Sequence, residues 1–153
     1  MIALIQRCDK ASVSVDEKIV GSIEGGLTVF LGVFKGDLEE ECEYLAKKIS
    51  SLRIFSDEND KMNLSVVDLN LGVLAISNFT LCANARKGTR PSYDMAERPE
   101  RARELYELFC EKLRENNVVK VEKGVFGAHM KVNVENNGPV SVILDTKEIM
   151  HKK

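Results

Sequence analysis

The chain has 153 residues, of which 44% are hydrophobic and 30% are charged, and its formal net charge is −2. This length and composition suit a single globular domain with an apolar core, over residues 1–153. The slightly acidic balance excludes a generic binder of polyanions, so any contact with nucleic acid requires a local basic patch.

Signals for targeting, membranes and metals are missing from the sequence. No apolar run approaches the roughly 20 residues that cross a membrane, and the start of the chain lacks the basic segment of a signal peptide. We therefore predict a cytoplasmic protein without membrane contact. The cysteines form no C-x-x-C pair and match no zinc spacing, so we interpret them as reduced structural thiols and expect no metal or cofactor. They are Cys8, Cys42, Cys82 and Cys110.

In the first half of the chain, apolar patterns predict strands over residues 1–8, 11–15 and 18–23. The near-continuous apolar run over 27–33 predicts a central strand that is buried on both faces. A second strongly apolar strand is expected over 72–79.

A helix is predicted between these two strands. Asp37 can cap it, and Glu40 three residues later fits a capping box. The apolar residues recur at helical spacing: Leu38, Cys42, Leu45, Ile49 and Leu52. A short strand over 53–55 and a polar loop over 56–61 follow it.

In the second half, residues 82–97 form a polar loop of a length that usually indicates function or disorder. Pro99 opens a second helix, whose apolar face is Ala102, Leu105, Phe109 and Leu113. Strands are predicted over residues 118–121, 125–128, 130–134 and 140–144, and a tail over 151–153. The expected fold is α+β, with a mixed, largely antiparallel sheet or partial barrel flanked by two main helices.

A Gly-Pro step, Gly138-Pro139, stands where the last predicted strand begins. Proline cannot donate to a sheet ladder, so it is confined to a strand's first residue, an edge or a bulge. An X-Pro bond also turns cis at a cost of only about 0.5–1 kcal/mol. Two interpretations stay open: a turn that leads into the strand, or a rigid device that points two carbonyls in an unusual direction.

Ser77, Asn78, Phe79 and Thr80 end a buried strand beside the long loop, a place where sites are commonly built. The segment offers two hydroxyls, a side-chain amide, and the backbone amides of Phe79 and Thr80. The simpler interpretation is the polar end of a strand.

The long loop carries Arg86, Lys87 and Arg90 close to Tyr93. Three cations in five residues can hold a phosphodiester backbone, although a solvated loop would show the same pattern.

Downstream, Phe126 stands among small residues, before Gly127 and Ala128 and close to Met130. This is the pattern of a flat platform on which a base stacks, or of plain core packing. His129 is the only plausible base for a Ser-His-Asp triad, but we expect it to be a packed or surface residue. No P-loop, G-x-S-x-G or H-E-x-x-H motif occurs, so an enzyme here would depend on backbone dipoles and on its substrate.

Taken together, these motifs resemble the D-aminoacyl-tRNA deacylase family over essentially the whole chain. The matching segments are R-x-F-x-D-E…K-M-N at 53–63, S-Q-F-T-L at 77–81, K-G-x-R-P-S-F/Y at 87–93, F-G-A-x-M at 126–130 and N-x-G-P-V-T at 136–141. Two positions depart from the family pattern: Asn78 replaces Gln, and Ser141 replaces Thr.

The resemblance implies a homodimer that hydrolyses the ester between a D-amino acid and the 3′-terminal adenosine of tRNA. We also expect cleavage of mischarged glycyl-tRNA, because glycine has no side chain that a steric filter could exclude. It implies a pocket built by residues 77–80, with the amides of Phe79 and Thr80 holding the oxyanion and the adenosine 2′-hydroxyl assisting. A cis Gly138-Pro139 step from the partner would exclude L-amino acids. Phe126, Gly127, Ala128 and Met130 would lie at the adenosine.

The basic residues Arg86, Lys87 and Arg90 are our own candidates for contacts with tRNA phosphates. Three other functions stay open at this point: a related threonyl-tRNA editing domain, a non-catalytic RNA-binding dimer, and a purely structural dimer. The free-standing length and the Gly-Pro step argue against the first. Deacylation of D-charged tRNA separates the enzyme from the other two.

Overall fold

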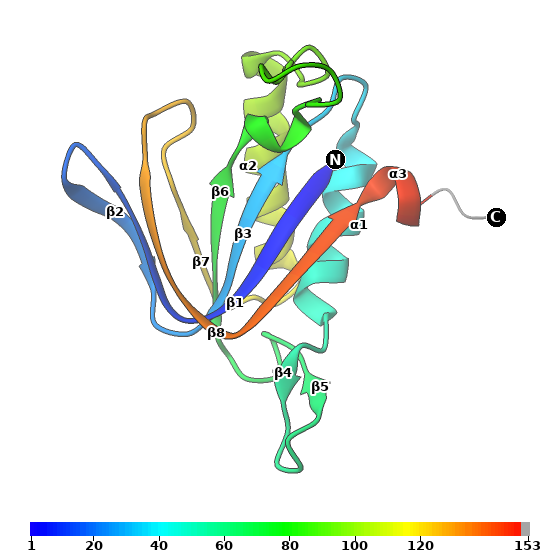
Figure 1. The fold of residues 1–153 in the computed structure, drawn as a ribbon. Coiled ribbons are helices and arrows are strands. Elements are labelled where there is room, and N and C mark those ends of the chain that lie inside the picture. Colours follow the sequence, from blue (N-terminus) through cyan, green and yellow to red (C-terminus); the bar gives the residue numbers. More distant parts are fainter. Residues whose placement is uncertain (151–153) are drawn as a thin grey trace.

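The computed structural model describes residues 1–150, and the predicted tail at 151–153 lies outside them. A six-stranded sheet curls into a partial barrel, and the helices α1 (Glu39–Ser51) and α2 (Pro99–Glu115) pack side by side on one of its faces (Figure 1). No helix within residues 1–150 has the length and apolar character needed to cross a membrane.

The sheet is mixed, as the sequence predicts. Its strands are β1 (Ile2–Val15), β2 (Lys18–Ile23), β3 (Gly26–Gly32), β6 (Gly72–Ser77), β7 (Lys120–Lys123) and β8 (Lys131–Asp145). The order is β2-β1-β3-β6-β7, and β8 pairs with β1. β1 is antiparallel to β2, β3 and β8, whereas β3–β6 and β6–β7 are parallel.

Four short elements complete the fold. A hairpin of β4 (Phe55–Ser56) and β5 (Met62–Leu64) projects from one end of the sheet, and η1 (Phe79–Cys82) is a 3-10 helix at the other end (Figure 1). The helix α3 (Thr146–Ile149) directly follows β8.

Apolar periodicity explains how the two main helices pack. The predicted stripes of α1 and α2 are turned toward the sheet, and Leu45, Ile49, Leu105 and Phe109 are completely buried there. β3 lies between β1 and β6, which explains its near-continuous apolar run. All four cysteines are free and buried, as expected for structural thiols.

A second, smaller cluster fills the inside of the curl. Successive side chains of a strand point to opposite faces, so Val73 and Ala75 of β6 join the helix side, while Leu74 and Ile76 join the inner cluster. Phe30 and Met130 pack against this inner cluster and stay half-buried. The inner face is therefore only partly covered by the chain.

Several predicted boundaries are wrong. The strands expected over 1–8 and 11–15 are one strand, β1, and those expected over 130–134 and 140–144 are joined in β8. In both cases the ladder continues across exposed polar residues, with irregularities in its register: Lys10 of β1 pairs with Glu135 of β8, and Cys8 pairs with Asn136. Residues 125–128 form a turn, closed by a hydrogen bond from the Ala128 amide to the Val125 carbonyl.

The start of α1 also differs from the prediction. Leu38 is the N-cap, not Asp37, and the carboxylate that accepts the hydrogen bond from the Leu38 amide belongs to Glu41 (2.6 Å), not to Glu40. The sequence places three acidic residues in a row, Glu39, Glu40 and Glu41, and only the angular position of Glu41 in the first turn brings it back over the cap.

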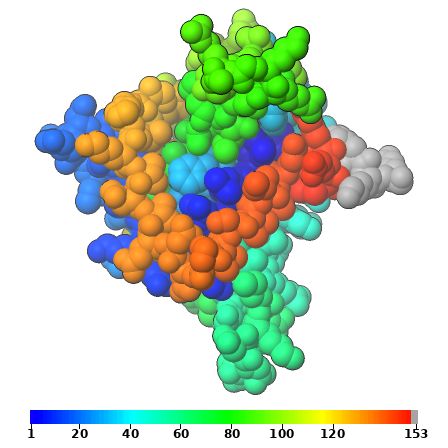
Figure 2. Space-filling view, in the orientation of Figure 1, coloured from blue at the N-terminus to red at the C-terminus, as the bar shows by residue number. Residues whose placement is uncertain are grey.

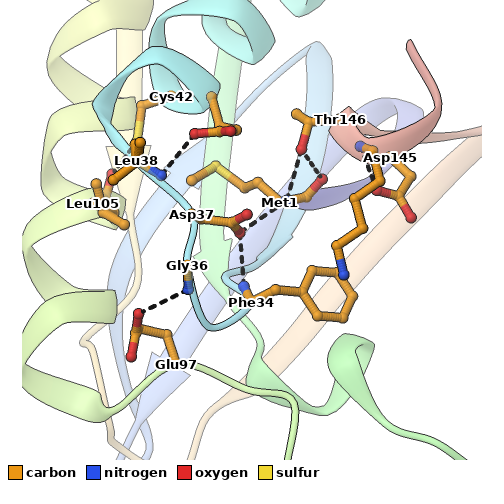
Figure 3. A network of polar contacts seen from close by, with 12 residues as sticks. Met1, Phe34, Gly36, Asp37, Leu38, Cys42, Glu97, Leu105, Asp145 and Thr146 are labelled. Carbon is orange, nitrogen blue, oxygen red and sulfur yellow. Dashed lines mark hydrogen bonds and ion pairs between the residues drawn. The ribbon is translucent and has the colours of Figure 1, made fainter. Parts of the chain in front are cut away.

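Asp37 has another role, in a buried polar network (Figure 3). Its carboxylate lies 2.8 Å from the amino group of Met1 and accepts a hydrogen bond from the Phe34 amide (2.7 Å). The same amino group donates to the hydroxyl of Thr146 (2.8 Å), at the start of α3. This network ties the beginning of β1 to α1 and to the end of β8.

Candidate active site

The segment after β6 turns over the end of the sheet and forms η1. The Asn78 amide still donates to the Leu31 carbonyl of β3 (2.8 Å), and the chain then turns into the 3-10 helix. Gly32 makes this close approach possible, because a Cβ there would lie 3.1 Å from the Cys82 sulfur and 3.1 Å from Leu81 Cβ. The predicted strand over 72–79 therefore ends at Ser77.

A cavity of about 860 Å³ opens beneath this segment. Ser77, Asn78, Phe79 and Thr80 line one part of it, and residues 126–130 line another. Its apolar floor is formed by Phe30, Ile76 and Val132. In the space-filling view, the segment after β6 (green) stands above the open face of the sheet, with β8 (orange) along that face (Figure 2). Two motifs that lie far apart in the sequence thus share one cavity.

The polar groups of η1 are arranged without a catalytic base. The Thr80 hydroxyl donates to the Asn78 side-chain oxygen (2.5 Å), and no other hydrogen bond to this hydroxyl is present within residues 1–150. The amides of Phe79 and Thr80 open a helical turn, so they lack intrahelical partners. In the described part of the chain, neither amide meets another acceptor. Two backbone donors are therefore available beside the cavity.

The residues 126–130 are positioned by β7 and α2. The Gly124 amide donates to the Ala75 carbonyl of β6 (3.3 Å), and the turn that follows places Gly127 at φ +79°. The Phe126 ring lies 6.0 Å from the ring of Tyr106, whose buried hydroxyl donates to the same Ala75 carbonyl (2.7 Å). Burial raises the pKa of Tyr106, so this phenol stays protonated as a donor.

The other residues of the 126–130 segment complete this wall of the cavity. Ala128 and Met130 are half-buried, and His129 is an exposed residue at the edge. His129 is thus a surface residue, which is one of the two positions that the sequence allows.

The basic residues of the long loop lie outside the cavity lining. Arg86, Lys87 and Arg90 are exposed at the tip of a loop. Paired backbone hydrogen bonds between Asn84 and Ser92 (2.8 and 2.9 Å) close this loop at its base.

Gly138 and Pro139 also lie outside the cavity lining of their own chain. Their peptide bond is cis, and both residues are exposed. They do not begin a strand, as the sequence suggests, but form a bulge inside β8, where residues 137–140 face the single residue Arg7 of β1. Arg7 donates to the Asn137 carbonyl (3.0 Å) and to the Ile54 carbonyl (2.9 Å). The bulge coincides with a sharp bend of β8, at the end of the sheet opposite η1 (Figure 1).

Several residues at the rim are not predictable from local sequence. Lys35, Asp94, Glu97 and Arg98 reach the cavity because the turn after β3 pairs with the end of the long loop. That pairing includes hydrogen bonds from the Lys35 amide to the Met95 carbonyl and from the Glu97 amide to the Val33 carbonyl (both 2.9 Å). Within residues 1–150, no group of three potential metal ligands is present.

Comparison with known proteins places the chain in a family. The family model described as "D-Tyr-tRNA(Tyr) deacylase" matches residues 4–145. A D-aminoacyl-tRNA deacylase of Persephonella marina is 56% identical over 149 residues, 97% of this chain and 100% of that protein. The D-aminoacyl-tRNA deacylase of Aquifex aeolicus is 55% identical, with the same coverage.

Two solved structures agree with this fold. A c-Myc DNA unwinding element binding protein is 37% identical, with a TM-score of 0.90, over 95% of this chain and 98% of that one. A probable eukaryotic D-amino acid tRNA deacylase is 14% identical and supports the fold alone, with a TM-score of 0.83 over 94% and 97% of the two chains. On the strength of the family model and of the close relatives, the chain belongs to the D-Tyr-tRNA(Tyr) deacylase family, a family of hydrolases.

Proposed function

We propose that this protein is a cytoplasmic D-aminoacyl-tRNA deacylase, which hydrolyses the ester between a D-amino acid and the terminal adenosine of tRNA. Family membership over residues 4–145 supports the reaction. The main observation in support of this location for the active site is that residues 77–80 and residues 126–130, distant in sequence, line one cavity. Two free backbone donors lie beside the cavity, and no hydrogen-bonded triad is present within residues 1–150, which favours a reaction assisted by the substrate.

In this proposal the chain stabilises charge and the tRNA supplies the hydroxyl. The amides of Phe79 and Thr80 hold the developing oxyanion, and each donor of such a pair contributes about 2.7–4 kcal/mol. The adenosine 2′-hydroxyl assists attack on the ester. Thr80 is no covalent nucleophile, because its hydroxyl donates to the Asn78 side chain and, within residues 1–150, makes no hydrogen bond with a base that could activate it. Asn78, shorter than the Gln that is usual in the family, acts through this local contact.

The adenosine lies along the other wall of the cavity. Phe126 is beside the adenine, within the wall that Gly127, Ala128 and Met130 complete. The contact with the buried Tyr106 ring fixes the position of the Phe126 ring. The loop tip with Arg86, Lys87 and Arg90 contacts phosphates of the tRNA, and its exposure leaves all three cations accessible.

Chirality is set by a second copy of the chain. Gly138 and Pro139 are exposed and outside their own cavity, so they are available to the cavity of a partner. Ile143, further along the same strand, leaves 66% of its surface exposed, which suits a homodimer interface. Rigid carbonyls at the α-carbon exclude the side chain of an L-amino acid, and glycine offers no side chain to exclude.

The first experiment measures deacylation of D-Tyr-tRNA, L-Tyr-tRNA, Gly-tRNA and L-Ala-tRNA at matched enzyme concentrations. We expect cleavage of the D-ester and survival of both L-esters. Gly-tRNA should be cleaved at a rate within a few orders of magnitude of the rate for the D-ester. Binding of tRNA without any cleavage would instead favour the non-catalytic RNA-binding dimer. Equal, strong protection of Gly-tRNA and L-Ala-tRNA would contradict steric exclusion.

A second experiment tests the shared site. Phe79→Pro removes one proposed oxyanion donor at a position, the first of a helical turn, where proline is tolerated. Phe79→Ala keeps the amide and is the control when kcat is compared at saturating tRNA. Gly138→Ala should inactivate the pocket of the partner, because the residue has φ +128° and a Cβ would lie 2.9 Å from Val140, so the Gly138-Pro139 segment must shift into the space for the substrate. Mixing the inactive Phe79→Pro and Gly138→Ala proteins should restore activity through hybrid dimers. No recovery despite proven subunit exchange would count against a shared site.

A further inference from the structure

Two aromatic rings at the mouth of the cavity have no role in the proposed catalysis. Phe79 is 57% exposed and Tyr93 is 41% exposed, and both line the cavity. Their ring centroids are 5.3 Å apart with an interplanar angle of 70°, an edge-to-face contact. The oxyanion needs only the backbone of Phe79, so neither side chain is accounted for. Large exposed apolar groups that gather at a cavity indicate a binding surface.

The Tyr93 ring is held on an anchored segment. The Tyr93 carbonyl accepts a hydrogen bond from the Ala96 amide (3.0 Å), and Ala96 pairs with Phe34 in the turn after β3. On the other side, the Asn84–Ser92 pair closes the loop immediately before Tyr93. The ring is therefore presented at a defined position by backbone contacts on both sides.

The same loop presents positive charge. Arg86, Lys87 and Arg90 are exposed within the turn that Asn84 and Ser92 close, and the Arg86 amide is fixed by the Asn84 side chain (3.0 Å). Aromatic rings beside a cationic loop match single-stranded nucleic acid, in which bases stack on rings and phosphates meet cations.

We propose that Phe79 and Tyr93 form a stacking site for the unpaired nucleotide that precedes the terminal adenosine of the tRNA, with the cationic loop next to its phosphate. This inference rests on the proposed function, which places the terminal adenosine at Phe126. The two aromatic sites, at different walls of one cavity, would hold two consecutive nucleotides of the unpaired 3′ end. The site adds affinity for a polynucleotide substrate and takes no part in bond cleavage.

The kinetic test compares two D-tyrosyl esters, one of adenosine and one of the dinucleotide cytidylyl-adenosine, with Tyr93→Leu and Tyr93→Phe. We expect Tyr93→Leu to lower the ratio of kcat/KM for the dinucleotide ester to that for the adenosine ester by about 5- to 150-fold, the range for loss of one stacked base. The loss should lie in KM. Tyr93→Phe, which keeps the ring, should preserve the ratio.

A spectroscopic test is independent of turnover and uses the absence of tryptophan from the chain. Tyr93→Trp introduces a single tryptophan, whose fluorescence, excited selectively over the remaining tyrosines, should be quenched by unesterified cytidylyl-adenosine and not by adenosine. Tyr44→Trp is the matched control: Tyr44 lies on α1, with its hydroxyl directed to the Ile149 carbonyl, and its replacement should report no quenching.

The outcomes separate the inference from the proposed function. If the wild-type protein cleaves neither ester nor D-Tyr-tRNA, the proposed function fails. If it cleaves them, but Tyr93→Leu affects both esters equally, or adenosine quenches Tyr93→Trp as strongly as the dinucleotide, the stacking site is wrong. Should Tyr93→Leu fail to fold, Tyr93→Trp and Tyr93→Phe still decide the question.

Discussion

The face of the sheet under α1 and α2 differs from the face inside the curl in how completely the chain covers it. On the helix side Leu45, Ile49, Leu105 and Phe109 are fully buried. On the inner side Phe30 and Met130 remain half-buried and line the cavity. The chain thus completes one core by itself and leaves the other open to a ligand.

The two faces therefore differ in role: the helix side contributes mainly to stability, and the inner side contributes mainly to function. A dry core gains its free energy from area removed from water and from close packing. The open face keeps apolar surface for a substrate, and for the second copy that we propose. Substitutions on the two faces should therefore have different signatures, and the following predictions test that separation from the largest expected effect to the smallest.

The first prediction makes the same substitution on both sides. Phe109→Ala should lower the free energy of unfolding by about 3–5 kcal/mol, as typical for a large buried ring, and leave kcat/KM per folded molecule unchanged. Phe126→Ala should cost less stability and lower kcat/KM, because the half-buried Phe126 ring lines the cavity. Urea unfolding and deacylation assays measure the two effects. Equal losses of activity in both variants would contradict the separation.

The second prediction concerns the polar network at the edge of the helix-side core. Asp37→Asn should lower the free energy of unfolding by about 3 kcal/mol, because it leaves the buried Met1 amino group without its counter-charge. Glu39→Gln is the control. Glu39 pairs with Arg101 on an exposed surface, and such pairs contribute little. Similar unfolding midpoints for wild type and Asp37→Asn would show that the ion pair is unimportant.

The same two faces explain how much of the fold could be predicted. Apolar periodicity indicated α1, α2 and β3, because the helix side is buried by this chain alone. It failed where a long strand crosses polar residues, as in β8, because a bulge lets the ladder resume in a new register. The capping role of Asp37 was wrong for a tertiary reason: its partner, Met1, is far away in sequence.

The candidate site was less accessible from the sequence than the fold. Local residue types singled out residues 77–80 and 126–130, but only the resemblance placed them together, and the cavity brings both segments to one surface. The contact between Phe79 and Tyr93 depends on how the long loop folds back over η1. The pattern of apolar residues along the sequence does not predict the distance between these two rings. The place of Gly138 and Pro139 in a site stays a prediction, because it depends on a second copy.

The third prediction follows from buried thiols between the two helices. Burial raises the pKa of Cys42 from 9.0 to about 12, and its sulfur donates to the Leu105 carbonyl (3.2 Å). Below pH 9.0 the thiol is protonated in both states and its contribution is complete. Above pH 9.0 the unfolded chain loses the proton and the folded chain keeps it, so stability falls as the pH rises toward 12.

The measurement compares urea unfolding of wild type and Cys42→Ala from pH 8 to pH 10. The difference between the two unfolding free energies should shrink by about 1.4 kcal/mol, the value of one pKa unit, because the variant lacks the titrating group. The difference isolates Cys42 from all other groups that titrate in this range. A constant difference across the range would show that the thiol is not desolvated in the folded protein.

The last prediction tests the boundary between the two faces at Gly124. A Cβ at this position would lie 2.5 Å from the sulfur of Met130, the flexible end of a side chain that lines the cavity. Gly124→Ala should therefore cost only about 1 kcal/mol of stability, the low end for an overpacked site. It should raise KM, because Met130 moves into the space for the substrate. Gly25→Ala is the control, since its Cβ would meet its nearest neighbour at an ordinary 3.5 Å.

Adding Met130→Ala to Gly124→Ala should recover stability, because the clash disappears, but not KM, because the cavity wall is then missing. Full recovery of both would mean that Met130 only fills space.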